Sequence, residues 1–123
     1  DERVVLLERT NIRHVTGDLI KEAVDLAVID VSFISLRLVI PAVLPFLRAG
    51  GWLLPLIKPQ FEAGRDQVGK RGVVRDPAVH RDVIEKVSAF VGEQGLRVIG
   101  TCDSPLTGPE GNREFFLLGK KEK

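Results

Sequence analysis

The sequence predicts an α/β domain, doubly wound around a mostly parallel sheet that closes on an antiparallel hairpin. Short apolar runs of strand length alternate with helix-like segments along most of the chain. Several of these runs are continuously apolar, as parallel strands buried on both faces are. No helix separates the last two runs, which favours an antiparallel pair. At 123 residues, the chain has the length of one domain.

Two apolar runs open the chain. Residues 3–8 are bounded by charges and predict a buried strand, with Thr10 and Asn11 following its carboxyl end. Residues 16–18 read as a turn or a helix cap. Residues 26–30 predict the second strand, which ends abruptly in Asp30. A carboxylate is therefore expected where a parallel strand leaves its sheet.

The next segment predicts a helix and a third strand. Two prolines within residues 35–48 forbid one uninterrupted helix, so we expect a short turn and then a helix that begins at Pro41. A Gly-Gly pair ends this helix, and residues 52–58 form the strand. Because a proline in a central strand removes a ladder hydrogen bond, Pro55 should mark the start of the strand or a bulge.

A long loop and an amphipathic helix follow. Residues 59–75 are polar and contain three glycines, which is typical of a functional or mobile loop. An aspartate N-cap and a proline at the first helical position then open a helix at residues 76–77. Apolar side chains at helical spacing carry the helix to Gly92 or Gly95.

The chain closes on two further strands. Residues 96–101 and 114–118 are apolar and lack a helix between them, so they are expected to be antiparallel neighbours. Residues 120–123, three lysines and a glutamate, are expected to form a frayed, solvated end.

The composition excludes several classes of function. Eighteen basic and seventeen acidic residues leave a formal charge of +1, so no overall field indicates nucleic acid or membrane as a partner. One cysteine and two distant histidines supply neither an internal disulfide nor a zinc site, and no metal is predicted. No apolar run approaches the ~20 residues of a membrane-spanning helix. We expect a cytoplasmic protein and, since no methionine is present, an internal piece of a longer one.

Three charged residues are predicted at one edge of the sheet. Asp30 and Lys58 end parallel strands, and Glu114 opens an antiparallel one, which brings all three to the same edge. Because Lys58 precedes a proline, its backbone is extended and its ammonium projects off the strand end. Such a lysine fixes and acidifies a hydroxyl that becomes a nucleophile. The alternatives are that Asp30 caps a turn or a helix and that Lys58 makes a structural ion pair.

Four basic residues gather in the loop of residues 59–75. Guanidinium groups pair with phosphate through two hydrogen bonds, and glycines let a backbone approach closely. The loop is therefore a candidate phosphate-binding segment, with a solvated surface loop as the alternative. The four residues are Arg65, Lys70, Arg71 and Arg75.

Four segments, in this order, resemble one known family. They read Asp-Val-Ser-Phe-Ile-Ser-Leu at residues 30–36, Leu-Ile-Lys-Pro-Gln-Phe-Glu-Ala-Gly at 56–64, Gly-Val-Val-Arg-Asp-Pro at 72–77 and Ser-Pro-Leu-Thr-Gly-Pro-Glu-Gly-Asn-Arg-Glu at 104–114. The chain resembles the TlyA, or hemolysin A-like, family of FtsJ-like, S-adenosylmethionine-dependent rRNA 2′-O-methyltransferases. The resemblance implies that residues 1–123 are the carboxyl-terminal part of a Rossmann-like methyltransferase domain. The family's S4-like domain and glycine-rich cofactor loop are not found in the sequence.

The resemblance also implies site residues and partners. Asp30, Lys58 and Glu114 match three members of a catalytic Lys-Asp-Lys-Glu set whose first lysine is not in this chain. S-adenosylmethionine is the implied cofactor, and its expected contacts are Thr10, Asn11 and Asp30. Ribosomal RNA or a ribosomal subunit is the implied partner, contacted by the basic loop and by Arg113.

We therefore expect the intact protein to transfer a methyl group to a ribose 2′-hydroxyl of ribosomal RNA. Lys58 would steer the hydroxyl, Asp30 would orient Lys58, and Glu114 would hold the geometry of the lysine. One alternative is a non-catalytic fragment that binds RNA but no cofactor. The other is a membrane-active hemolysin, which the sequence supports little because it has no long apolar segment.

Overall fold

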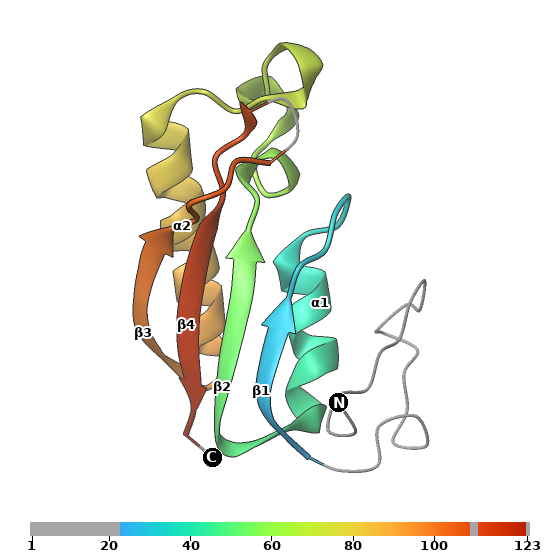
Figure 1. The fold of residues 1–123 in the computed structure, drawn as a ribbon, viewed down its shortest axis with the longest axis vertical. Helices are drawn as coiled ribbons and strands as arrows, with labels where there is room; N and C mark the ends of the chain where they lie inside the picture. Colours follow the sequence, from blue (N-terminus) through green and yellow to red (C-terminus); the bar gives the residue numbers. More distant parts are fainter. Residues whose placement is uncertain (1–22, 109–110, 123) are drawn as a thin grey trace.

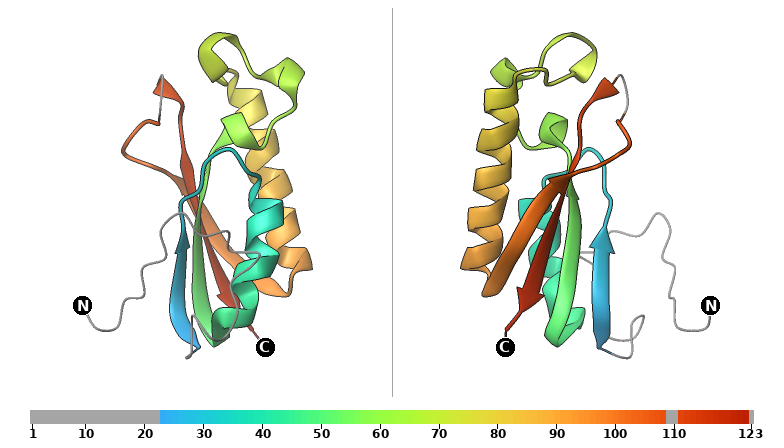
Figure 2. Two further views of the ribbon diagram at one scale, coloured as in Figure 1. Left: turned by 90° about the vertical axis from the view of Figure 1, so that its right-hand side faces the viewer. Right: turned by 60° about the vertical axis from the view of Figure 1, so that its left-hand side comes forward.

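The computed structural model describes residues 23–108 and 111–122, which form a four-stranded sheet with two α-helices on one face (Figure 1, Figure 2). The strand expected at residues 3–8 and the turn at residues 16–18 lie outside the described residues. The elements are β1 (Val24–Ile29), α1 (Leu36–Val43), β2 (Leu47–Ile57), α2 (Pro77–Glu93), β3 (Leu96–Asp103) and β4 (Phe115–Lys121).

The sheet has the order β1-β2-β4-β3. β1 pairs with β2 in parallel, and β4 is antiparallel to both β2 and β3. Three strands share one direction and only β4 opposes them, so the described sheet is mixed, with one parallel and two antiparallel pairs, and the predicted closing antiparallel hairpin is confirmed. Because β4 lies beside β2, its first residue is at the carboxyl end of β2, where a ligand-binding edge is expected.

Helix α1 begins earlier than predicted. It starts at Leu36 and not at Pro41, since Ser35 is its N-cap and the Ser35 hydroxyl accepts a hydrogen bond from the backbone N–H of Arg37. Pro41 lies inside the helix, where it removes one hydrogen bond, and burial of the apolar helix face outweighs this loss. The helix nevertheless ends at Val43, so the prediction that the prolines prevent a long helix is confirmed.

Strand β2 is longer than predicted because it includes the Gly-Gly pair that was expected to end a helix. The parallel register with β1 shifts next to this pair, and Gly50 has a φ of +81°. A Cβ on Gly51 would lie 2.9 Å from the carbonyl oxygen of Arg48 and 3.0 Å from that of Asp25. The close approach of two backbones therefore requires glycine here, and the pair bends the strand without ending it.

Pro55 is neither at the start of β2 nor in a bulge, contrary to the prediction. It lies within the strand, opposite Ile29 of β1. Towards β4, Leu54 and Pro55 have no paired partner, while the pairs on either side of them keep one register. The ladder is interrupted there without a register shift, because proline has no N–H to donate.

Helix α2 begins and ends as the sequence predicted. The Asp76 side chain accepts a hydrogen bond from the backbone N–H of Ala78 at 2.9 Å, and Gly95 follows the helix with a φ of +90°. The apolar stripe of the helix is buried against the sheet, where both helices and all four strands form one core. The most completely buried members include Ile40, Leu53, Ile57, Val83, Val87, Val91 and Leu117.

The expectation of a frayed carboxyl-terminal tail is wrong for its first two lysines. Lys120 and Lys121 belong to β4. The ammonium of Lys121 donates hydrogen bonds to the carbonyl oxygens of Leu44 and Leu47, at 2.8 and 2.6 Å. These carbonyls belong to the turn after α1 and to the first residue of β2, so a charged side chain that appeared solvated in the sequence has protein acceptors.

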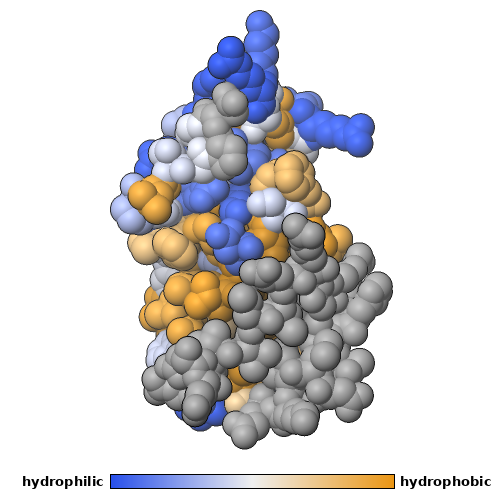
Figure 3. Space-filling model, turned by 45° about the vertical axis from the view of Figure 1, so that its right-hand side comes forward, coloured by the Kyte–Doolittle hydropathy of each residue, from blue (hydrophilic) through white to orange (hydrophobic). Residues whose placement is uncertain are grey.

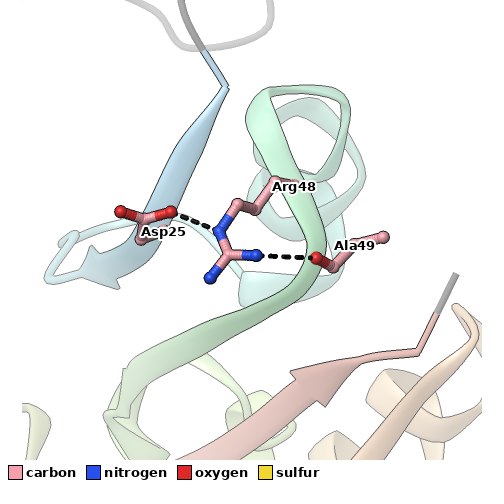
Figure 4. Close-up of polar contacts among 3 residues, drawn as sticks. All are labelled: Asp25, Arg48 and Ala49. Atoms are coloured by element: carbon pink, nitrogen blue, oxygen red, sulfur yellow. Dashed lines mark hydrogen bonds and ion pairs between the residues drawn. The ribbon is translucent and has the colours of Figure 1, made fainter.

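An ion pair joins the amino ends of β1 and β2, far from the edge where charged residues were predicted (Figure 4). Arg48 contacts the carboxylate of Asp25 and donates a second hydrogen bond to the carbonyl oxygen of Ala49 at 3.2 Å. Both side chains are more than half exposed, at 53% and 80%, so solvent screens the pair. It contributes less than about 1 kcal/mol to stability.

The sheet face opposite the helices is also apolar. Leu26, Val28, Trp52 and Ile99 lie on the strands and are substantially exposed. Apolar side chains on both faces are typical of sheets covered on both sides. No described helix combines the length and apolar character needed to cross a membrane.

Candidate functional site

The carboxyl ends of β1 and β2 bring Asp30 and Lys58 together. The ammonium nitrogen of Lys58 lies 2.5 Å from Oδ1 of Asp30 and donates a hydrogen bond to the Ser32 hydroxyl at 3.2 Å. The Lys58 side chain is only 11% exposed, whereas that of Asp30 is 64% exposed. A nearly buried ammonium is therefore fixed at the edge of the sheet by a carboxylate that still faces solvent. Asp30 is not the cap of α1, because Ser35 has that role.

Glu114 lies at the same edge but does not reach Lys58. The antiparallel register of β2 and β4 ends at the pair Ile57 and Phe115, so Lys58 and Glu114 are the next residues in line. Glu114 is buried, with 9% exposure. Among the described residues its carboxylate makes no ion pair with Lys58. It packs instead against Gly108, where a Cβ would lie 2.2 Å from Oε2 of Glu114.

Glu62 is a site residue that the sequence did not single out. Its Oε1 accepts a hydrogen bond from the Ser35 hydroxyl at 2.6 Å, and its Oε2 accepts one from the backbone N–H of Leu36 at 2.8 Å. Burial raises the pKa of this carboxyl above its usual value, although the two hydrogen bonds and the charge of Arg37 act in the opposite direction. Its partners are 26 and 27 residues away, so no local pattern indicates the contact.

An exposed aromatic residue stands beside the Asp30 and Lys58 pair. Phe33 is 90% exposed, and its backbone has a φ of +63°, which is uncommon for a residue other than glycine. Its ring contacts that of Phe61 at a centroid distance of 5.0 Å. A strained backbone that presents an aromatic side chain to solvent is typical of a ligand-contacting segment.

The basic loop is exposed at the end of the molecule that carries these residues. Figure 1 shows the loop beyond the carboxyl end of β2, and hydrophilic side chains gather at the corresponding top end of the molecule in Figure 3. All four predicted phosphate-binding residues in this loop are exposed: Arg65, Lys70, Arg71 and Arg75. The loop of residues 59–75 directly follows Lys58, so it begins at the candidate site.

A buried asparagine anchors this loop to the segment before Glu114. The Asn112 side chain accepts a hydrogen bond from the backbone N–H of Val74 at 3.0 Å and donates one to the carbonyl oxygen of Gly72 at 2.9 Å. The buried His80 ring contacts the Val74 carbonyl oxygen at 2.7 Å. The carboxyl-terminal end of the loop is therefore fixed to the rest of the domain by hydrogen bonds, although its basic side chains are exposed to solvent.

The remaining predicted site residues are either engaged in other contacts or lie outside the described residues. Arg113 is exposed but already forms an ion pair with Asp103, and its guanidinium lies 5.8 Å from the centroid of the Phe115 ring. Thr10 and Asn11 lie outside the described residues. Within residues 23–108 and 111–122, no group of three His, Cys, Asp or Glu side chains is arranged to hold a metal ion.

Comparison with known proteins gives consistent results. A model of the FtsJ-like methyltransferase family matches residues 1–121. YqxC of Bacillus subtilis, a candidate rRNA methyltransferase, is 51% identical over 118 residues, which are 95% of this chain and 42% of YqxC. The 16S/23S rRNA (cytidine-2′-O)-methyltransferase TlyA of Mycobacterium tuberculosis is 47% identical over 117 residues, 95% of this chain and 44% of TlyA.

A solved structure shows the same arrangement. A candidate hemolysin from Lactococcus lactis superposes with a TM-score of 0.90 at 45% identity, over 98% of this chain and 58% of that one. The chain thus spans less than half the length of the curated relatives it matches.

Proposed function

Since the chain belongs to the FtsJ-like methyltransferase family, we propose that it is the carboxyl-terminal part of a methyltransferase domain whose intact protein methylates a ribose 2′-hydroxyl of ribosomal RNA. The observation that carries this proposal is the nearly buried ammonium of Lys58, 2.5 Å from Asp30 at the carboxyl edge of the sheet. The similarity to TlyA and YqxC supports ribosomal RNA as the substrate.

The pair fits the needs of a methyl transfer to a hydroxyl. S-adenosylmethionine, which the family implies, would supply a methyl group activated by a sulfonium. Lys58 would position the 2′ oxygen and stabilise the negative charge that develops on it as its proton passes to water. The exposed carboxylate of Asp30 fits a contact with the cofactor while it orients Lys58. Thr10 and Asn11 remain proposed as further cofactor contacts.

Methylation of ribosomal RNA by the full-length protein tests the proposal. Purified ribosomal subunits, or the RNA extracted from them, would be incubated with S-adenosylmethionine labelled in its methyl group. After nuclease digestion, mass spectrometry should detect a 2′-O-methylated nucleoside. A methyl group on a base, or no transfer together with absent cofactor binding in calorimetry, would contradict the proposal and favour a non-catalytic RNA-binding module.

The packing of the Glu114 carboxylate against Gly108 gives a specific prediction. In a Gly108→Ala variant the new methyl group would occupy the position of the Glu114 carboxylate, which must then move. Because that carboxylate ends a flexible side chain, we expect a small change in thermal stability but a loss of methyl transfer of about tenfold. Gly92→Ala is the matched control, since a Cβ there has no neighbour within 4 Å. Equal activity of the two variants would remove Glu114 from the proposed site.

The exposed basic loop is proposed to contact the RNA backbone, together with Arg113. In a variant with Arg65→Ala and Lys70→Ala, we expect weaker binding of an rRNA fragment and a shallower dependence of affinity on salt. Each lost phosphate contact reduces that slope by about 0.7 to 0.9. Fluorescence anisotropy over a range of KCl concentrations measures both quantities. A variant with Arg81→Ala and Lys86→Ala, on α2, controls for the loss of two charges, and equal slopes for the two variants would exclude the loop.

A further inference from the structure

Two segments of the candidate site are joined at several points along their length. Residues 30–36 connect β1 to α1, and residues 58–62 follow β2. Lys58 contacts Asp30 and Ser32 near the strand ends, and the rings of Phe33 and Phe61 meet further along. The last of these contacts is at the start of α1, where Glu62 accepts hydrogen bonds from Ser35 and Leu36. The geometry of Asp30 and Lys58 therefore depends on how these two segments are held together.

Glu62 makes the strongest of the outer contacts. Both of its carboxylate oxygens accept hydrogen bonds, one from the Ser35 hydroxyl and one from the Leu36 backbone N–H. Leu36 is the first residue of α1, so its N–H has no acceptor within the helix. The Ser35 hydroxyl in turn accepts from the backbone N–H of Arg37. A charged acceptor strengthens such bonds, so the carboxylate ties the start of α1 to the segment that carries Lys58.

The loop of residues 30–36 needs a contact such as that of Glu62, referred to below as the tie, to hold its conformation. Phe33 holds a positive φ with its side chain almost fully in solvent, so little packing of its own stabilises that conformation. Gln60 does not supply the tie, because its buried amide has no hydrogen-bond partner in the part of the chain that the structure describes. Beyond Lys58 itself, Glu62 is the polar side chain of residues 58–62 that bonds to the loop.

We propose that Glu62 is a positioning residue, which fixes the loop of residues 30–36 against the end of β2 and thereby sets the geometry of Asp30 and Lys58. The inference rests on the proposed methyl transfer for its effect on activity, but the tie itself is a separate structural claim. Glu62 acts through hydrogen bonds and does not need to touch substrate or cofactor. A side chain of the same shape with an acceptor for Leu36 should therefore replace it.

Hydrogen exchange and kinetics of the full-length protein test the proposal. In Glu62→Ala, we expect faster exchange over residues 30–36 and a fall in kcat of about tenfold, with KM for RNA changed by less than about twofold. In Glu62→Gln, the amide oxygen can accept from Leu36 and the amide nitrogen can donate to Ser35, so both quantities should return close to wild type. Ser35→Ala, which removes one bond, should be intermediate. Glu85→Ala, on the exposed side of α2, is the control.

Several outcomes would overturn the proposal. Wild-type exchange in Glu62→Ala would show that the carboxylate does not hold the loop. A Glu62→Gln variant as slow as Glu62→Ala, with protected amides, would show that the charge acts in the reaction. If Glu62→Ala does not fold, the comparison of Glu62→Gln with Ser35→Ala still decides the matter. A wild-type protein that transfers no methyl group would refute the proposed function, while the exchange data would still test the tie.

The raised pKa of Glu62 gives an independent prediction about stability. The folded state binds the proton of this carboxyl more tightly than the unfolded state, in which the pKa of the group is near 4.5. This contribution to stability is therefore present below pH 4.5 and is lost as the pH rises through the folded value. Glu62→Gln removes it, so the melting temperature of the variant, relative to wild type, should rise across that interval. If the difference in melting temperature between Glu62→Gln and wild type stays constant from pH 4 to pH 7, burial does not disfavour the ionised form of Glu62 and the prediction is wrong.

Discussion

A Lys58→Ala variant of the full-length protein is expected to lose methyl transfer by a factor of about 10² to 10⁴ while it keeps its fold. The lysine presents a nearly buried positive charge beside Asp30, at the sheet edge where a hydroxyl would approach. Removal of a group that positions and stabilises a reacting oxygen has effects of this size. The rate of a single turnover with labelled S-adenosylmethionine is the appropriate measurement, because product release then has no influence.

The fold should tolerate this substitution. The carboxylate left without its partner, that of Asp30, is 64% exposed and will be hydrated. Lys58→Arg keeps the charge but replaces a compact ammonium by a planar guanidinium, so we expect only partial activity. Lys86→Ala removes an exposed lysine from α2 and serves as the control. Methylation by Lys58→Ala at the wild-type rate, with normal melting, would exclude Lys58 from the reaction.

The meeting of Asp30 and Lys58 could be predicted because it follows from the direction of the strands. Each residue directly follows an apolar strand, and parallel neighbours end at the same edge. The edge position of Glu114 followed in the same way from the antiparallel last strand. The separation of its carboxylate from Lys58 could not be predicted, because the packing of that carboxylate against Gly108 depends on the path of the segment before β4. Strand direction thus places residues at an edge but does not orient their side chains.

Other features depend on contacts between distant parts of the chain. The start of α1 at Leu36 is favoured by Glu62, 26 residues away, which supplies an acceptor that no local pattern reveals. Pro55 is accepted within β2 because β1 still pairs with that position. Lys121 is ordered by one carbonyl group of the turn after α1 and one at the start of β2. In each case tertiary contacts outweigh a local preference that was read correctly.

Asn112→Ala is expected to lower the free energy of unfolding by about 2 to 4 kcal/mol and to weaken RNA binding at the same time. Asn112 is 3% exposed and bonds to both Val74 and Gly72, so the alanine would leave a buried N–H and a carbonyl without their partner. Each unsatisfied group of this kind costs about 1 to 3 kcal/mol. Urea denaturation measures the loss, and Thr107→Ala, an exposed change in the same segment, controls for it.

The two effects of Asn112→Ala share one cause, which makes the prediction specific. Asn112 is two residues from Glu114 and holds the end of the basic loop, so it joins the proposed RNA contacts to the proposed catalytic edge. If the loop binds RNA in its anchored form, affinity must fall even under conditions in which the variant is fully folded. Unchanged affinity of the folded variant would show that the basic residues bind RNA without this anchor. Unchanged stability would contradict the two hydrogen bonds of the buried Asn112 side chain.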